Sequence, residues 1–181
     1  MSSPRIPPGG LRDIGLPIWA FSRLAGRVTK GEAPRIFTTL GRNRGLFWGW
    51  LHFAGRLMPG GRLPRVDTEL VILRVAAVRG SDYEWGHHAV LGRRAGLSPD
   101  DLARVRLGSA AVGWSDTRSL LLRASEALLA DRDLDDVLWG ELRAAYDERT
   151  CIELLMLVGH YDMLATTLHT LRVQPESRER H

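Results

Sequence analysis

A run of nine residues, LVILRVAAV at positions 70–78, constrains the fold of this chain more than any other stretch. Every residue in it except Arg74 is apolar, so only a buried element accommodates it. Its β-branched residues would also suit a buried strand. We predict a helix, because the length and the alanines suit one and because no second clear strand exists with which it could pair.

Helical periodicity recurs along most of the remaining sequence. The predicted helices cover residues 16–25, 34–40, 46–58, 67–79, 81–96, 98–107, 115–129, 133–146 and 148–171. No repeat, linker or change in composition divides the chain. We therefore predict an all-α fold, a compact single-domain helical bundle of about seven or eight helices, over residues 11–173. Residues 1–10 and 174–181 are predicted to be a flexible N-terminal arm and a flexible tail.

Local signals predict where some helices begin and end. Gly26 is expected to end the first helix. Asp67 or Thr68 is expected to cap the apolar helix, which would place Glu69 in the first turn, where the positive helix end favours a carboxylate. The residues SPDD at 98–101 resemble a capping box at the start of another helix.

Composition restricts the class of protein. The 44% hydrophobic and 25% charged residues are typical of a folded globular chain and exclude disorder for its body. The formal net charge of +4 comes mainly from scattered arginines without a nucleic-acid motif, so we expect a small anion as ligand, and a merely solvated basic surface stays open. Residues 1–10 contain no apolar run, so we expect no secretory signal and no membrane anchor.

Cys151 is the only cysteine of the chain. An intramolecular disulfide, a CxxC pair and a thiolate metal cage are therefore all excluded, which suits a reducing cytoplasm. Because Cys151 lies in an apolar run, it is predicted to be a small core residue rather than a nucleophile.

Three ionisable residues follow Gly80 within little more than one helical turn: Glu84, His87 and His88. Residues three and four apart on a helix are neighbours, so Glu84 can share a face with either histidine. The two histidines point about 100° apart, so only one can face where Glu84 faces. A carboxylate beside an imidazole is in outline a proton-transfer pair. A zinc or iron site is less favoured, because the three groups do not form HExxH and no second ligand cluster appears.

Other polar residues in apolar surroundings are also candidates. Glu69 either stabilises its helix by placing a carboxylate near the positive helix end or acts as a proton carrier. Arg74, if buried, needs an anionic partner, which would be Glu69, Glu84 or a substrate carboxylate. His160 and Tyr161, in the apolar last helix, are either hydrogen-bonded core groups or the border of a pocket.

Residues 67–96 resemble the carboxymuconolactone decarboxylase and alkylhydroperoxidase D-like family. In the redox branch of that family, a glutamate is followed twelve residues later by the first cysteine of a CxxCxxxH motif. Here Glu69 is followed at that distance by Ser81, and Glu84 and His88 take the positions of the second cysteine and of the motif histidine. The last helix resembles the closing helix of the family more loosely.

The two substitutions distinguish between the branches. A thiol peroxidase needs one thiolate to attack the peroxide and a second thiol to resolve the product, and neither Ser81 nor Glu84 can be oxidised reversibly. The residues YEWGHH at 83–88 resemble instead the decarboxylase side of the family, whose activity is a cofactor-free loss of carbon dioxide from a lactone acid. The resemblance thus implies no cofactor and no metal.

The resemblance also implies roles for individual residues. Glu84 and His88 would be the catalytic proton-transfer pair, with Glu69 as a relay or orienting group. Arg74 would anchor the substrate carboxylate. The remaining candidates for substrate binding are Ser81, Tyr83, Trp85, His87, His160 and Tyr161, with the aromatic residues of 47–53 as a dry wall.

Taken with the resemblance, these residues predict a decarboxylase-like enzyme acting on a small cyclic or lactone carboxylic acid. We expect a cytoplasmic homo-oligomer, a trimer or hexamer or else a dimer, with no nucleic-acid or membrane partner. The alternative is a catalytically silent family member that acts as a binding or assembly protein. Peroxidase activity through Cys151 is the least favoured.

Overall fold

The computed structural model describes residues 3–29 and 32–176. Over these residues it is all-α, as predicted, with nine helices and no strand. Each of the nine segments with helical periodicity forms a helix of its own, so the predicted total of seven or eight helices was one too low. The helices are α1 (Leu11–Thr29), α2 (Arg35–Leu40), α3 (Arg44–Leu57), α4 (Arg65–Arg79), α5 (Asp82–Ala95), α6 (Pro99–Leu107), α7 (Asp116–Asp131), α8 (Asp136–Ala145) and α9 (Glu148–Leu171).

The chain divides into two compact units. The first comprises residues 1–54 and 167–181, and the second comprises residues 55–166. The single domain at 11–173 stays a prediction. The first two residues of the predicted arm and residues 177–181 of the predicted tail lie outside the described residues.

Aromatic side chains form the core of the first unit. Phe47 on α3 is buried against Ile14 and Ile18 of α1, and the Phe21 and Phe37 rings meet edge to face, with centroids 5.1 Å apart. The partly buried residues packed against this core are Trp19, Phe21, Phe37, Leu40, Trp50 and Leu51. The aromatic residues of 47–53 thus have partners within their own unit, and their contribution to the wall of a substrate pocket stays a prediction.

Helix α1 differs from the predicted first helix at both ends. Gly15 has φ 80° and ψ 159°, which interrupts the helix just before Pro17, where a new helical start is favoured. The helix then continues past Gly26 to Thr29. The prediction that Gly26 ends the helix was wrong, because this glycine serves a close approach: a Cβ there would lie 2.7 Å from the carbonyl oxygen of Glu32.

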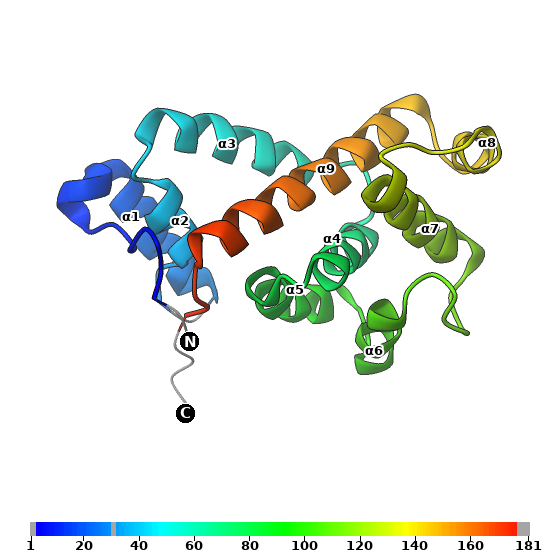
Figure 1. Cartoon of the computed structure of the whole chain (residues 1–181), viewed down its shortest axis with the longest axis horizontal. Helices are drawn as coiled ribbons and strands as arrows, with labels where there is room; N and C mark the ends of the chain where they lie inside the picture. Colours follow the sequence, from blue (N-terminus) through cyan, green and yellow to red (C-terminus); the bar gives the residue numbers. More distant parts are fainter. Residues whose placement is uncertain (1–2, 30–31, 177–181) are drawn as a thin grey trace. The chain divides into compact units, whose positions relative to one another are not determined.

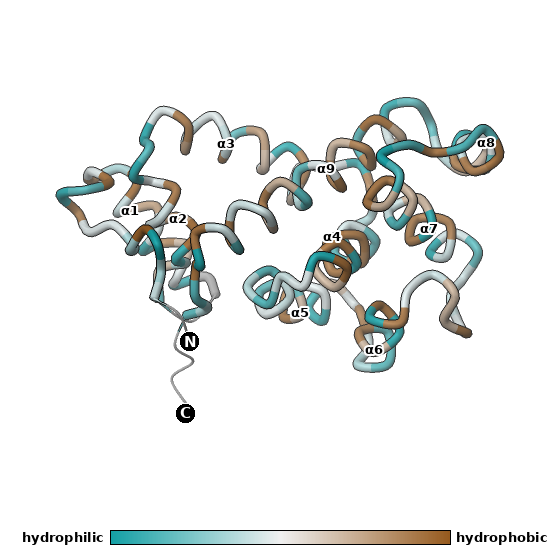
Figure 2. Tube along the Cα trace, in the orientation of Figure 1, coloured by the Kyte–Doolittle hydropathy of each residue, from teal (hydrophilic) through white to brown (hydrophobic). Residues whose placement is uncertain are grey.

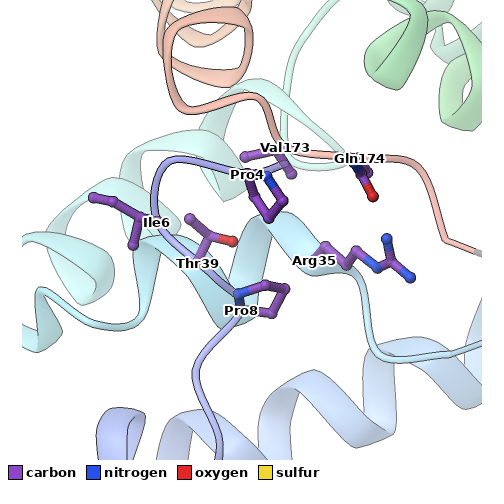
Figure 3. Close-up of a pocket in the computed structure, with 7 residues that line it drawn as sticks. All are labelled: Pro4, Ile6, Pro8, Arg35, Thr39, Val173 and Gln174. Atoms are coloured by element: carbon purple, nitrogen blue, oxygen red, sulfur yellow. The ribbon is translucent and has the colours of Figure 1, made fainter. Parts of the chain in front are cut away.

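Residues 3–10 run along the first unit without forming a helix. The Arg5 amide donates to the carbonyl of Leu171 at 2.9 Å, and the Gly9 amide donates to the carbonyl of Thr38 at 2.9 Å. A small pocket lies beside this segment (Figure 3), and the buried Thr39 hydroxyl has no hydrogen-bond partner among the described residues. The pocket is lined by Pro4, Ile6, Pro8, Arg35, Thr39, Val173 and Gln174, so no candidate site residue borders it.

Helix α4 is the central element of the second unit (Figure 1). It packs against α5, α6 and α7, while α8 packs on α7. Figure 2 shows the run of hydrophobic residues along α4. Its leucines enter a core cluster that consists of Leu70, Leu73, Leu97, Val105 and Leu122. The predicted burial of the run 70–78 is confirmed for Leu70 to Leu73, which are completely buried, but Val78 at its end is 40% exposed.

The start of α4 differs from the prediction in a way that matters for the site. Pro64 occupies the N-cap position, so the helix begins at Arg65, and neither Asp67 nor Thr68 caps it. Glu69 therefore lies in the second turn, one turn after Arg65. The predicted capping box at residues 98–101 is confirmed, with both reciprocal hydrogen bonds present.

Helix α9 contributes to the second unit up to Thr166. Its Glu153 carboxylate accepts the backbone N–H groups of Arg62 at 2.6 Å and Leu63 at 3.0 Å, and its Asp162 lies 2.6 Å from the Arg79 guanidinium. The helix is long and apolar enough to cross a membrane, but half of its most apolar window is buried, and core helices pass the same test.

Candidate active site

A buried hydrogen bond between α4 and α5 forms the centre of the candidate site. His88 Nδ1 lies 2.7 Å from Glu69 Oε2, and the two residues are 7% and 0% exposed. A carboxylate at this position accepts the Nδ1 proton and orients the imidazole, so that Nε2 becomes the reactive nitrogen. Nε2 has no hydrogen-bond partner among the described residues. The histidine that pairs with a glutamate in the structure is therefore His88 and not His87.

Gly92 allows the two helices to approach closely at this point. It lies one turn after His88, and a Cβ there would be 2.9 Å from Leu97 Cδ1, 3.3 Å from Leu73 Cδ1 and 3.6 Å from Glu69 Cβ. A larger side chain would therefore push α5 away from α4 and from Glu69.

Arg65 contacts the second oxygen of Glu69. Its Nη2 lies 2.6 Å from Glu69 Oε1, as an ion pair between residues one turn apart. The buried carboxylate therefore has an imidazole on one oxygen and a guanidinium close to the other. The side chain of Arg65 is 37% exposed, whereas that of Glu69 is fully buried.

Glu84 lies one turn before His88 on α5 and is only 3% exposed. Neither of its carboxyl oxygens has a hydrogen-bond partner of ordinary geometry among the described residues. Burial raises the pKa of Glu84 to about 7; the nearby Ser81 hydroxyl counteracts this rise, and the charge of Asp162 adds to it. Glu84 therefore carries its proton about half of the time at neutral pH, as a general acid or base requires.

Helix α9 supplies two aromatic groups to the same place. The Tyr161 ring meets the His88 ring edge to face at 5.2 Å and the His160 ring at 5.1 Å. Burial and the charges of Glu69 and Glu84 raise the pKa of Tyr161, against a smaller lowering by Arg65, so its hydroxyl keeps its proton. Burial, together with His88, lowers the pKa of His160 to about 4, so this imidazole is neutral at physiological pH.

Arg74 lies elsewhere, and its predicted pairing with Glu69 or Glu84 was wrong. Its Nε lies 2.7 Å from Glu126 Oε1, and Nη1 donates to the carbonyls of Val105 at 2.9 Å and Arg106 at 3.2 Å. Arg74 is five positions after Glu69, which turns its side chain about 140° around the helix. The guanidinium therefore binds the end of α6 instead of the candidate site.

Trp85, three residues before His88 on α5, has packing partners of its own. It packs against the core cluster around Leu70, and the Arg106 guanidinium lies 3.8 Å from the centre of its ring. Adjacent helical residues point about 100° apart, which separates Trp85 from Glu84. The predicted place of Trp85 in the wall of a substrate pocket stays a prediction.

The remaining candidates on α5 surround its first turns. The buried Tyr83 and the half-buried His87 form a ring pair with centroids 4.7 Å apart, on a different face from His88. Ser81 occupies the N-cap position of α5 and is buried near Glu84. In the described part of the chain, no group of three His, Cys, Asp or Glu side chains is placed to hold a metal ion.

The sequence of this region matches a known family. Residues 44–127 fit the sequence profile of the Carboxymuconolactone decarboxylase family. This region belongs to the carboxymuconolactone decarboxylase family. It contains Glu69, Glu84 and His88 and lacks the CxxC motif, whereas His160 and Tyr161 lie beyond it. No curated protein matches the sequence.

Solved structures with low sequence identity share the fold of this chain. The alkylhydroperoxidase AhpD core of an uncharacterized peroxidase-related protein from Ralstonia eutropha JMP134 has 16% identity and a TM-score of 0.85, with 98% of this chain and 94% of that chain covered. An uncharacterized peroxidase-related protein from Silicibacter sp. TM1040 has 14% identity and a TM-score of 0.80, with 98% and 96% covered. A variant of the debrominase Bmp8 in complex with 2,3,4-tribromopyrrole has 15% identity and a TM-score of 0.79, with 95% and 91% covered.

Three residues of the candidate site were not recognised from the sequence. Arg65 is one turn before Glu69 and Gly92 is one turn after His88, so helical spacing alone contained the signal for both. Asp162, whose charge acts on Glu84, comes from α9 and had no such local signal.

Proposed function

We propose that this protein is a cofactor-independent, decarboxylase-like carbon–carbon lyase that acts on a small cyclic or lactone carboxylic acid. The observation that carries the proposal is Glu84, a buried carboxyl group whose two oxygens lack partners of ordinary geometry and whose pKa is raised to about 7. Such a group is a proton donor at neutral pH. It lies one helical turn from the oriented imidazole of His88.

The proposed reaction requires one proton and no redox change. The bond between the ring carbon and the carboxylate breaks, carbon dioxide leaves, and the electron pair of the bond stays on the carbon. Glu84 gives its proton to this carbon, which forms the new C–H bond. His88, through Nε2, returns a proton taken from solvent to Glu84, while Glu69 holds the imidazole in position. Buried surroundings favour a step in which the substrate loses its charge.

The likeness to peroxidase-related proteins does not change this proposal. Ser81 and Glu84 stand where the redox branch has its two cysteines, and a peroxidase cycle needs both thiols. The debrominase of the same fold was solved with 2,3,4-tribromopyrrole, a small ring, which supports a small cyclic ligand here as well. We also propose a cytoplasmic location and a homo-oligomer, whose copy number sedimentation velocity would measure.

The experiment measures carbon dioxide release from carboxymuconolactone and from a panel of small cyclic and lactone acids. We expect turnover by the wild type and a loss of about a hundredfold or more in E84Q and in H88N, the usual range for removing an acid or base. Circular dichroism spectra should stay nearly unchanged. The matched controls, E148Q and H169N, alter exposed residues of α9 and should retain activity.

Two results would refute the enzyme. Full activity in E84Q or H88N would remove these groups from the mechanism. Binding of an acid near His88 without any turnover would favour instead the silent binding protein.

A further inference from the structure

The proposed reaction leaves one requirement unassigned, a cation for the carboxylate of the ligand. Arg74 was the cation predicted to bind this carboxylate. In the structure, its guanidinium contacts Glu126 and two carbonyl groups at the end of α6. A guanidinium with these partners has little capacity left for a ligand. The cation has to come from another residue of the second unit.

Arg65 meets this requirement by position. It is the first residue of α4, and its Nη2 is 2.6 Å from Glu69 Oε1, while the other Glu69 oxygen binds His88. Only the carboxylate of Glu69 would therefore separate a ligand bound to Arg65 from the imidazole of His88. Arg65 and Glu69 lie on the same helix, so their relative position is set by α4 and does not depend on α6.

Arg65 also meets the requirement for a cation because its guanidinium has N–H donors that remain available to a ligand. A guanidinium carries five N–H groups, and Glu69 is the one ion-pair partner of Arg65 among the described residues. The side chain is 37% exposed, whereas that of Glu69 is fully buried and that of His88 is 9% exposed. A small anion from solvent thus meets the guanidinium before it meets the buried pair.

The local charge does not oppose an anion at this position. Glu69 and Arg65 compensate each other, and Glu84 is partly neutral at physiological pH because of its raised pKa. The planar fork of an arginine binds a carboxylate through two parallel hydrogen bonds, which a neutral amide of the same shape cannot reproduce.

We propose that Arg65 is the carboxylate-binding residue of this site and that it selects carboxylic acids over neutral analogues. The inference deepens the proposed function, on which it rests, and names the residue that recognises its class of substrate. A purely structural Arg65 would neutralise Glu69 without any effect on the choice between an acid and its amide.

Binding without turnover tests the proposal, with benzoate and its neutral counterpart benzamide as probes. The full chain is titrated with each at constant ionic strength, at a pH of about 6, where Glu84 is mostly protonated. Ring resonances of His88 in nuclear magnetic resonance spectra report occupancy. We expect saturable benzoate binding by the wild type and binding of benzamide that is about tenfold weaker, as for loss of a charge-assisted hydrogen-bond pair.

The variants separate anchoring from structure. R65Q should weaken benzoate about tenfold and bring the preference for benzoate over benzamide close to one, and R65K, which keeps the charge but not the fork, should fall between. The control R74Q/E126Q removes both charges of the ion pair between Arg74 and Glu126 and should bind benzoate like the wild type. If R65Q does not fold, an unchanged preference in R65K overturns the proposal.

Other outcomes are equally decisive. Retention of the preference in R65Q, or no benzoate binding near His88 in the wild type, overturns the inference about Arg65. Loss of the preference in R65Q supports it even where no acid is decarboxylated, so a failure of the proposed function is distinguishable from a failure of the carboxylate site.

Discussion

Two glutamates of the same site differ in their chemistry because their surroundings differ. Glu69 is fully buried but has His88 and Arg65 next to its oxygens, which stabilise its negative charge. Glu84 is almost as deeply buried and lacks hydrogen-bond partners of ordinary geometry. An unpaired buried carboxylate is costly, so Glu84 holds its proton close to neutral pH, and its pKa of about 7 follows from burial.

The raised pKa of Glu84 predicts a dependence of stability on pH. Between the ordinary pKa of 4.5 and about 7, the folded protein keeps a proton that the unfolded chain has released. The free energy of unfolding therefore falls as the pH rises through this range and levels off above it, by up to roughly 3 kcal/mol. In E84Q this contribution disappears, and urea denaturation across the range should show E84Q gaining stability relative to the wild type.

His160 contributes in the opposite direction but does not obscure this result. Its pKa is lowered to about 4, so its neutral form stabilises the fold above 6.5 and this stabilisation is lost as the pH falls toward 4. Both proteins contain His160, so the difference between the two curves isolates Glu84. Parallel curves for the wild type and E84Q would contradict the assigned burial of Glu84.

At the scale of helices, the site depends on how closely α4 and α5 pack. Gly80, in the left-handed conformation at φ 63°, ends α4 and turns the chain into α5. Gly92 then lets α5 lie against Leu73 and Glu69. The spacing of Glu84, His88 and Gly92 at intervals of one turn places all three on the face that meets α4 and α9.

Two glycines of α5 should respond differently to alanine. G92A puts a methyl group 2.9 Å from Leu97 Cδ1, so we expect a loss of about 1–3 kcal/mol in the free energy of unfolding, the usual effect of overpacking. G86A meets no atom within 4 Å and should stabilise the helix by about 0.5–1 kcal/mol. Thermal or urea denaturation compares the two, and equal effects would show that the close approach at Gly92 is not required.

The segment before α4 depends on one side chain of α9. Glu153 accepts the amides of Arg62 and Leu63, so E153A leaves two partly buried donors without a partner. We expect a loss of about 2–4 kcal/mol in the free energy of unfolding. The control E148A removes an exposed carboxylate of the same helix and should change stability by less than about 0.5 kcal/mol. Similar losses in both variants would argue against this capping role.

For the molecule as a whole, the number of thiols limits the chemistry. Cys151 is the only cysteine and is completely buried, with its sulfur near the carbonyls of Leu142 and Tyr146. The chain has no second thiol that could resolve an oxidised Cys151. The likeness of the fold to peroxidase-related proteins thus does not extend to a pair of redox cysteines.

The folded protein should be inert toward hydroperoxides. With tert-butyl hydroperoxide and a thiol reductant, we expect no turnover above the background, and mass spectrometry should find Cys151 unoxidised until the chain is unfolded by urea. C151S serves as the control and should behave like the wild type. Sulfenic acid at Cys151 in the native protein, together with turnover that C151S lacks, would establish the thiol peroxidase instead.

Much of the architecture was predictable because helices depend on local patterns. The apolar run 70–78 required a buried helix, and the residues SPDD at 98–101 defined the start of α6. Gly26 and the start of α4 were misread for a different reason. A glycine that admits a neighbouring backbone and one that ends a helix look alike in sequence, and Pro64 took the N-cap position that the polar residues after it were expected to fill.

The sequence by itself determined that the chain is helical, that Glu84 can share a helix face with His87 or His88, and that no thiol pair is available, because spacing and residue type are local properties. The tertiary structure decided that Glu69 pairs with His88 and that Arg65, not Arg74, is the cation beside it. Such choices depend on the rotation and the separation of helices that are distant in sequence, and the periodicity of one helix contains no information about either.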